Sequence, residues 1–147
     1  MKKFFLLLPL LLVVTVLTAF SRSARNNDPG TEESFRKHFA GASNVKWTRE
    51  EGGYVSVSFI WADHRTIAYF NQDAELVGCI RGINFSQLPF TVMRSVDRQF
   101  ENSDILEIRE ITNGEGVIYS IMLEHTNKKF KIRLNSAGDL LAKEKIK

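Results

Sequence analysis

Apolar and polar side chains alternate through most of this 147-residue chain, a pattern typical of half-buried β-strands. In one stretch, Val55, Val57 and Phe59 alternate with two serines. Eight such stretches are joined by connections of only a few residues, which favours antiparallel hairpins over parallel crossovers. The predicted strands are residues 45–49, 54–61, 65–71, 75–80, 105–111, 117–125, 129–135 and 139–145.

Two segments have apolar side chains three and four residues apart, which predicts helices. The first covers residues 32–40, with Thr31 at its N-cap, and the second covers residues 89–101, with Pro89 at its first position. Their apolar faces are Phe35, His38 and Phe39 in the first, and Val92, Met93, Val96 and Phe100 in the second.

The chain repeats itself. Residues 71–77 align without a gap on residues 135–141, at an offset of 64, and the apolar positions of the strands before them keep the same phase. We therefore predict a tandem duplication within one domain of residues 31–147, with repeats at 31–84 and 85–147. Each repeat is a helix followed by a four-stranded meander. The predicted fold is α+β, with two helices on one face of an eight-stranded antiparallel sheet.

The first residues predict export. Lys2 and Lys3 precede an apolar run over residues 4–20, and small residues at the end of the run suit a cleavage site, so residues 1–21 are a predicted signal peptide and 22–30 a linker. An uncleaved anchor is the alternative, although the run lies at the short end of the roughly 17–25 residues that span a bilayer. Cleavage predicts a periplasmic or secreted protein with no stable membrane insertion.

Charge and composition exclude several classes. Hydrophobic residues make up 44% and charged residues 25%, as in ordinary globular domains. The formal charge is +3, and without Lys2 and Lys3 it is about +1, so no nucleic-acid partner is expected. Cys79 is the only cysteine, which rules out an internal disulfide and predicts a small buried hydrophobic side chain.

No residue set predicts a reaction centre. The three histidines have no metal-ligand spacing, and no nucleophile or phosphate-loop motif is present. Asn71, Asp73 and Glu75 resemble the start of a calcium loop, but Leu76 stands where that loop needs Gly, so a hairpin turn is the better interpretation. We expect no cofactor, no metal site, no catalytic residue and no enzymatic activity.

Strand alternation also predicts an open sheet face, directed away from the helices. Its aromatic, apolar and basic side chains are of types enriched at protein interfaces. The predicted partner-binding residues are Tyr54, Trp61, Ile67, Tyr69, Met122 and Arg133. A plain sheet surface is the alternative, because strand propensity selects similar residues.

Several short motifs resemble the PepSY-like family of exported bacterial proteins. They are Asn44-Val45-Lys46-Trp47, Gly53-Tyr54, Ala68-Tyr69-Phe70-Asn71, Leu88-Pro89, and Asn135 with Gly138. The resemblance implies a fold similar to β-lactamase inhibitory protein, an envelope location, and neither cofactor nor catalytic centre. Ala74 departs from the family, which usually has Gly at this turn position.

These observations together predict a non-enzymatic periplasmic protein-binding module. It would bind another exported or membrane protein through the open sheet face and the hairpin loops. An inhibitor-like role follows from fold analogy alone. The alternative is a periplasmic carrier of a small ligand or a metal ion.

Overall fold

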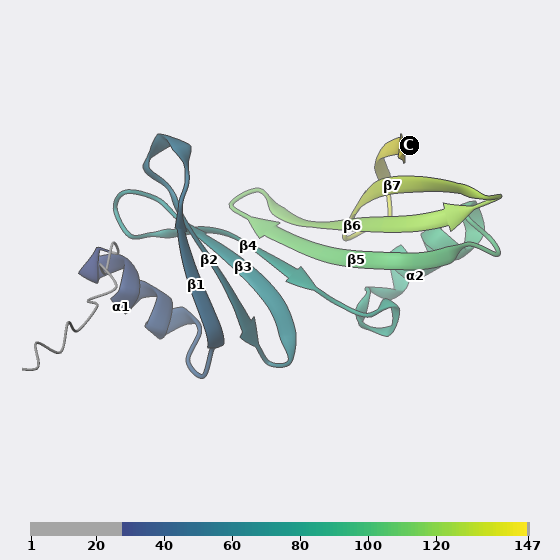
Figure 1. Cartoon of the computed structure of the whole chain (residues 1–147). Helices are drawn as coiled ribbons and strands as arrows, with labels where there is room; N and C mark the ends of the chain where they lie inside the picture. Colours follow the sequence, from purple (N-terminus) through teal and green to yellow (C-terminus); the bar gives the residue numbers. More distant parts are fainter. Residues whose placement is uncertain (1–27, 147) are drawn as a thin grey trace, which may run out of the picture.

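The computed structural model describes residues 28–146 and has two helices and one eight-stranded antiparallel sheet, which confirms the predicted α+β class (Figure 1). Each strand pairs with the next one in sequence, so the sheet order is β1 to β8. The helices are α1 (Pro29–His38) and α2 (Phe90–Gln99). The strands are β1 (Ser43–Arg49), β2 (Val55–Trp61), β3 (His64–Phe70), β4 (Leu76–Gly82), β5 (Asp104–Asn113), β6 (Gly116–His125), β7 (Lys128–Asn135) and β8 (Leu140–Ile146).

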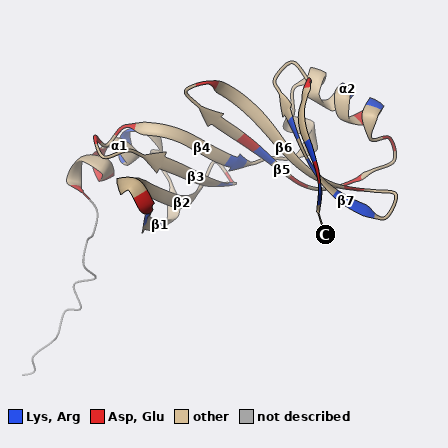
Figure 2. Cartoon of the chain, turned by 90° about the horizontal axis from the view of Figure 1, so that it is seen from above, with Lys and Arg blue, Asp and Glu red and all other residues tan. Residues whose placement is uncertain are grey.

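The sheet is continuous through its middle, where β4 pairs with β5. Seen along two directions, it forms a long twisted ribbon with α1 near one end and α2 near the other (Figures 1 and 2). Both helices lie on the same face, as a line of cross-strand pairs shows. Ala68, which is in the core under α1, pairs with Cys79, and Cys79 pairs with Thr112. Thr112 in turn pairs with Val117, which packs against the core under α2.

Each helix covers its own hydrophobic core. Phe35 and Phe39 of α1 pack on β2 and β3, with the Phe35 and Phe59 rings edge to face at 4.9 Å between centroids. In the other half, Val92 and Val96 of α2 pack on β5 to β7. Both cores lie on the helix-covered face, and within residues 28–146 neither helix packs on the opposite face of the sheet.

Equivalent hairpin turns join β3 to β4 and β7 to β8. In each turn an asparagine, Asn71 or Asn135, accepts hydrogen bonds from the backbone N–H groups two and four residues later, at 3.0 and 2.9 Å. These bonds confirm the interpretation of residues 71–75 as a turn, since an Asn side chain stabilises a turn through its own backbone.

The helices begin at other positions than predicted. Helix α1 starts at Pro29, three residues earlier than expected, with Asp28 as N-cap, and Thr31 is buried in its first turn. Pro29 suits this position because its fixed φ matches a helix and its missing N–H would be unpaired there. In α2, Pro89 is the N-cap rather than the first helical residue.

The predicted signal peptide, residues 1–21, and most of the predicted linker lie outside the described residues. Only positions 28–30 of that linker are described, and 29–30 belong to α1. Within residues 28–146, neither helix has the length and apolar character needed to cross a membrane.

Candidate functional site

The open face is the side of the sheet opposite α1 and α2. Strand by strand, Ile67 of β3 pairs with Ile80, Ile80 with Ile111, and Ile111 with Ile118 of β6. Cross-strand partners project from the same face, so these four side chains form a continuous apolar line, here called the isoleucine row. All four are half-buried, and none belongs to either helix-covered core.

A second line of side chains crosses the same strands beside the isoleucine row. It contains Arg65 of β3, Arg109 of β5 and Arg133 of β7, here called the arginine row. The strands between them contribute small residues, since Arg109 pairs with both Gly82 and Ser120, and Ser120 pairs with Arg133. Each arginine is exposed.

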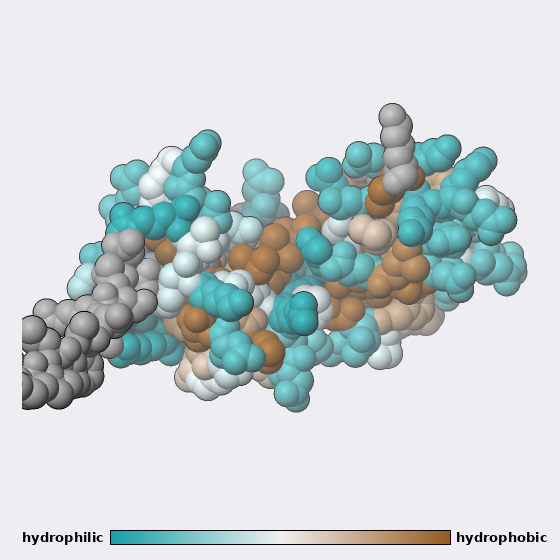
Figure 3. All heavy atoms as spheres, in the orientation of Figure 1, coloured by the Kyte–Doolittle hydropathy of each residue, from teal (hydrophilic) through white to brown (hydrophobic). Residues whose placement is uncertain are grey.

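The two rows meet in a groove of about 560 Å³ over β1 to β5. Ile60, Ile67 and Ile80 contribute its apolar surface, and Lys46, Arg65 and Arg109 its basic groups. Glu107 also lines the groove and forms an ion pair with Arg109 at 2.8 Å. Hydrophobic surface is visible over the middle of the sheet in Figure 3.

Five of the predicted partner-binding residues are accessible on or beside this face. Ile67, Tyr69, Met122 and Arg133 project from it, as their pairing with Ile80, Gly78, Lys131 and Ser120 shows. Tyr54 lies in the β1–β2 connection and is 45% exposed. Their role in binding stays a prediction.

Trp61 does not share that face. Its Nε1 donates a hydrogen bond to the Ala40 carbonyl oxygen at 3.1 Å, and its ring packs edge to face on Phe39, with 5.5 Å between centroids. The placement follows from alternation, because Trp61 has the same parity as Val57 and Phe59, which face α1. Assigning Trp61 to the open face was therefore wrong.

Sequence reasoning also missed Ile80, Ile111 and most of the arginine row. These residues become neighbours through the pairing of β4 with β5, which joins the two halves of the chain. Alternation within β5 was a usable signal for Ile111, because it has the opposite parity to the buried Ile108. The register between the halves has no local sequence signal.

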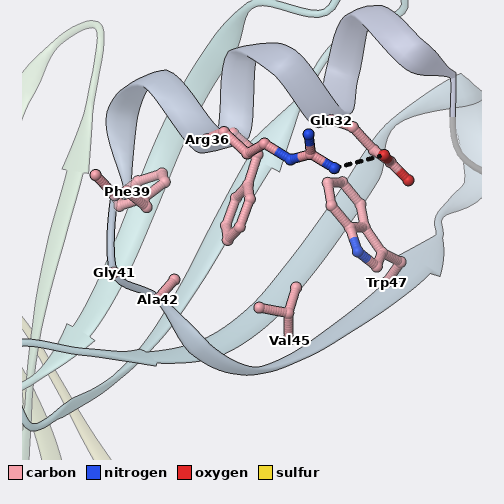
Figure 4. Close-up of a pocket in the computed structure, with 9 residues that line it drawn as sticks. Glu32, Arg36, Phe39, Gly41, Ala42, Val45 and Trp47 are labelled. Atoms are coloured by element: carbon pink, nitrogen blue, oxygen red, sulfur yellow. Dashed lines mark hydrogen bonds and ion pairs between the residues drawn. The ribbon is translucent and has the colours of Figure 1, made fainter.

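A second groove, of about 530 Å³, lies between α1 and β1 on the helix-covered side (Figure 4). Phe35, Phe39 and Trp47 line it, and an ion pair between Arg36 and Glu32 at 3.4 Å lies at its edge. Its lining holds no cysteine or histidine and a single carboxylate, Glu32, which is engaged in that pair. Nothing in this groove suggests catalysis.

A smaller hollow of about 180 Å³ lies between the halves on the helix-covered side. It contains Cys79 beside an ion pair of Arg81 and Glu110 at 2.8 Å. Burial raises the pKa of the Cys79 thiol, with Arg81 opposing and Glu110 adding to the rise. Burial and Glu110 also raise the pKa of Tyr119, whose hydroxyl donates to Glu110 at 3.3 Å. A thiol kept protonated in this way is a poor nucleophile.

The histidines are separated and make structural contacts. His64 contacts Gln87 at 3.1 Å and His125 contacts Ser103 at 2.9 Å. His38, predicted on the apolar face of its helix, is exposed instead, with Nδ1 2.8 Å from the Ser34 carbonyl oxygen. In the described part of the chain, no three His, Cys, Asp or Glu side chains are placed to hold a metal ion.

Comparison with known proteins identifies the fold. No family model and no curated protein sequence matches the chain. Among solved structures, a putative periplasmic protein from Bacteroides eggerthii DSM 20697 is 18% identical with a TM-score of 0.72, over 81% of this chain and 88% of that one. A BLIP-like protein from Bacteroides fragilis NCTC 9343 is 16% identical with a TM-score of 0.70, over 81% and 86%. A DUF2874 family protein from Bacteroides ovatus ATCC 8483 is 18% identical with a TM-score of 0.70, over 80% and 86%.

These similarities establish that the chain has the BLIP-like fold, as the sequence motifs implied. None of the three proteins is identified as PepSY-like, so the resemblance to that family stays a prediction.

Proposed function

We propose that this protein is a non-enzymatic, periplasmic module that binds another exported or membrane protein through the open face. The observation that carries the proposal is the isoleucine row, which crosses four strands and has neither helix of residues 28–146 over it. Contiguous apolar surface bordered by polar side chains is characteristic of protein-binding sites. Burial of this row in a complex would provide the hydrophobic part of the binding energy.

The architecture suits a rigid binding surface. The side chains of the open face project from paired strands, so their relative positions are fixed before a partner arrives, which lowers the entropic cost of binding. Tyr69, Met122 and Arg133 on this face are of types enriched at interfaces. The hairpin turns at the ends of the strands lie where a partner could make additional contacts.

The predicted signal peptide and the similarity to a putative periplasmic protein support the location. An inhibitor-like action is the narrower form of the proposal and is supported by the likeness to a BLIP-like protein. Such an action would follow if the bound surface of the partner included its active site.

Site-specific photo-crosslinking in the native cells tests the proposal. Benzoylphenylalanine is introduced in place of Tyr69 on the open face, and, as the matched control, in place of Phe90, which is 67% exposed on α2. Both changes replace one aromatic side chain by another, so the fold is preserved. We expect a discrete crosslinked protein from position 69 and none from position 90.

Crosslinks only from position 90, or none from position 69 in cells that express the protein at native levels, would contradict the use of the open face. A small-ligand or metal carrier, the alternative from the sequence, would give no protein crosslink from either position.

A further inference from the structure

The spacing of the arginine row and the isoleucine row restricts the shape of a partner that contacts both. Neighbouring strands lie about 4.8 Å apart, so arginines on β3, β5 and β7 recur about every 9.6 Å across the sheet. On each strand the isoleucine is two residues from the row of Arg65, Gly82, Arg109 and Ser120, or about 6.6 Å away. A partner that uses both rows must run across the strands.

The charges on this face favour an acidic partner. Among residues 28–146, Arg65 and Arg133 have no ion-pair partner, whereas Arg109 is paired with Glu107. Glu144 pairs in register with Lys131, and Glu124 with Lys129. Two other acids of the face lie away from the arginine row, since Asp104 is opposite Glu124 at the end of β5 and Glu50 accepts a hydrogen bond from Ser56 in the β1–β2 connection. Lys46 adds a further positive charge at the β1 end of the groove. The surplus is therefore positive along the arginine row.

The 9.6 Å interval selects the conformation of the partner. In an α-helix, residues seven apart lie on nearly the same side and about 10.5 Å apart. In an extended strand, side chains on one face recur at about 6.6 or 13 Å, and neither distance matches. Gly82 and Ser120 leave room between the arginines, since a Cβ on Gly82 would have only the Arg65 carbonyl oxygen within 4 Å, at 3.8 Å.

We infer that the open face binds an acidic amphipathic helix of the partner, laid across the strands. Its carboxylates, seven residues apart, contact the arginine row. Apolar side chains three residues after each carboxylate lie about 60° to one side of the carboxylates and pack on the isoleucine row. This inference rests on the proposed function, because it specifies the partner of the same face. The carboxylates supply ion pairs with Arg65 and Arg133 that no side chain in residues 28–146 supplies.

Fluorescence anisotropy with labelled helical peptides tests the inference. The first peptide, of about 18 residues, has Glu at every seventh position and Leu three residues after each Glu. A second has Lys in place of Glu, and a third has Gln. The full chain is compared with R133E, with I80T, and with K128E as the control for charge, since Lys128 is exposed and begins β7 away from both rows.

We expect the Glu peptide to bind at least about tenfold more tightly than the Lys peptide, with an affinity that falls as salt is added. R133E and I80T should each weaken binding about fivefold or more, and K128E should leave it unchanged. Circular dichroism confirms that each variant is folded.

Equal affinities for the Glu, Gln and Lys peptides would overturn the acidic character and leave the proposed function intact. If no peptide binds at millimolar concentration but position 69 still gives a crosslink, the partner does not bind as a helix, and the proposed binding face is unaffected. Binding to vesicles of anionic lipid in preference to the Glu peptide would also overturn the inference.

Discussion

In each half of the chain a hairpin turn contacts the first turn of the helix, but the residues at this contact differ between the halves. In the C-terminal half, Gly138 of the β7–β8 turn approaches Thr91 at the start of α2, and a Cβ on Gly138 would lie 2.5 Å from the Thr91 carbonyl oxygen. In the N-terminal half, the turn has Ala74 and the helix has Gly30. The small residue is thus on the turn in one half and on the helix in the other.

This difference predicts that G138A and A74G change the free energy of unfolding in opposite directions and by different amounts. Ala74 and Gly138 both have positive φ, 61° and 88°. G138A should lower the free energy of unfolding by at least about 2 kcal/mol, since it adds backbone strain to a steric collision. A74G should raise it by up to about 1 kcal/mol, because it relieves the strain without a collision.

Urea unfolding of both variants measures the difference. Changes of equal size and opposite sign would show that backbone strain alone accounts for both effects and that the contact of the turn with the helix is unimportant.

The indole of Trp61 predicts a second difference at this scale. W61A removes the hydrogen bond to Ala40 and the contact with Phe39, and we expect it to lower the free energy of unfolding by about 2–3 kcal/mol. Y69A removes a half-buried ring from the open face and should cost less than about 1.5 kcal/mol. Thermal unfolding of the two variants distinguishes them, and a smaller loss for W61A than for Y69A would contradict the assigned faces.

Cys79 predicts a pH dependence of stability. Its pKa is raised by burial in the folded state, so the folded chain holds the thiol proton more tightly than the unfolded chain. As pH rises above about 8.5, the usual pKa of a thiol, the unfolded state loses the proton first and the free energy of unfolding falls. Tyr119 acts in the same direction at higher pH, since its pKa is also raised.

The C79A variant should show a shallower fall in stability between about pH 8 and 9.5 than the unchanged chain, because the alanine has no proton to lose. Urea unfolding across this range measures the slope. Identical slopes would mean that burial of the thiol contributes nothing to the pH dependence.

At the scale of elements, the sequence predicted those strands and turns that depend on neighbouring residues alone. Alternation in Val55, Val57 and Phe59 predicted β2, and Asn71 predicted its turn, because period and turn chemistry depend on neighbouring residues. The start of α1 was misplaced, since the polar residues before Glu32 resemble a linker although Pro29 and Gly30 are helical.

The arginine and isoleucine rows could not be predicted from any single strand, because they depend on how strands from the two halves pair. Strand β4 extends to Gly82, two residues beyond its predicted end, and this extension creates the pairing with Arg109. Propensity gave no reason to extend a strand through Gly82, because glycine is unfavourable in strands. The site is therefore a property of how the halves pair.

At the scale of the whole molecule, the edge strands β8 and β1 of two different copies could pair as β4 and β5 do within one copy. The repeat alignment places β4 on β8 at an offset of 64. It places β1 on β5 at an offset of 61, because Trp47 and Ile108 pair with the equivalent residues Val57 and Ile121. Strand β8 of one copy could therefore pair with β1 of another in the register of β4 with β5. The internal pairs are Ile80 with Ile111 and Arg81 with Glu110. The corresponding intermolecular pairs would be Glu144 with Glu50 and Lys145 with Arg49.

Like charges would thus stand opposite each other at both positions, and such charges are a common means of preventing edge-to-edge association. The double variant E144I/K145E removes both repulsions and should associate head to tail as concentration rises. Sedimentation velocity measures this, with E144D/K145R as the control that keeps the charges. Equal sedimentation of the two double variants would show that the edge charges do not prevent association.

The sequential strand order has a mechanical consequence. Since β1 and β8 are opposite edges of one sheet, a force applied between residues 28 and 146 acts across the strands, along the direction of their hydrogen bonds. Such a load separates strands from an edge inward, a few bonds at a time, instead of shearing whole strands at once. The same order that gives the sheet a long open face thus lets its strands separate one after another when the two edges are pulled apart.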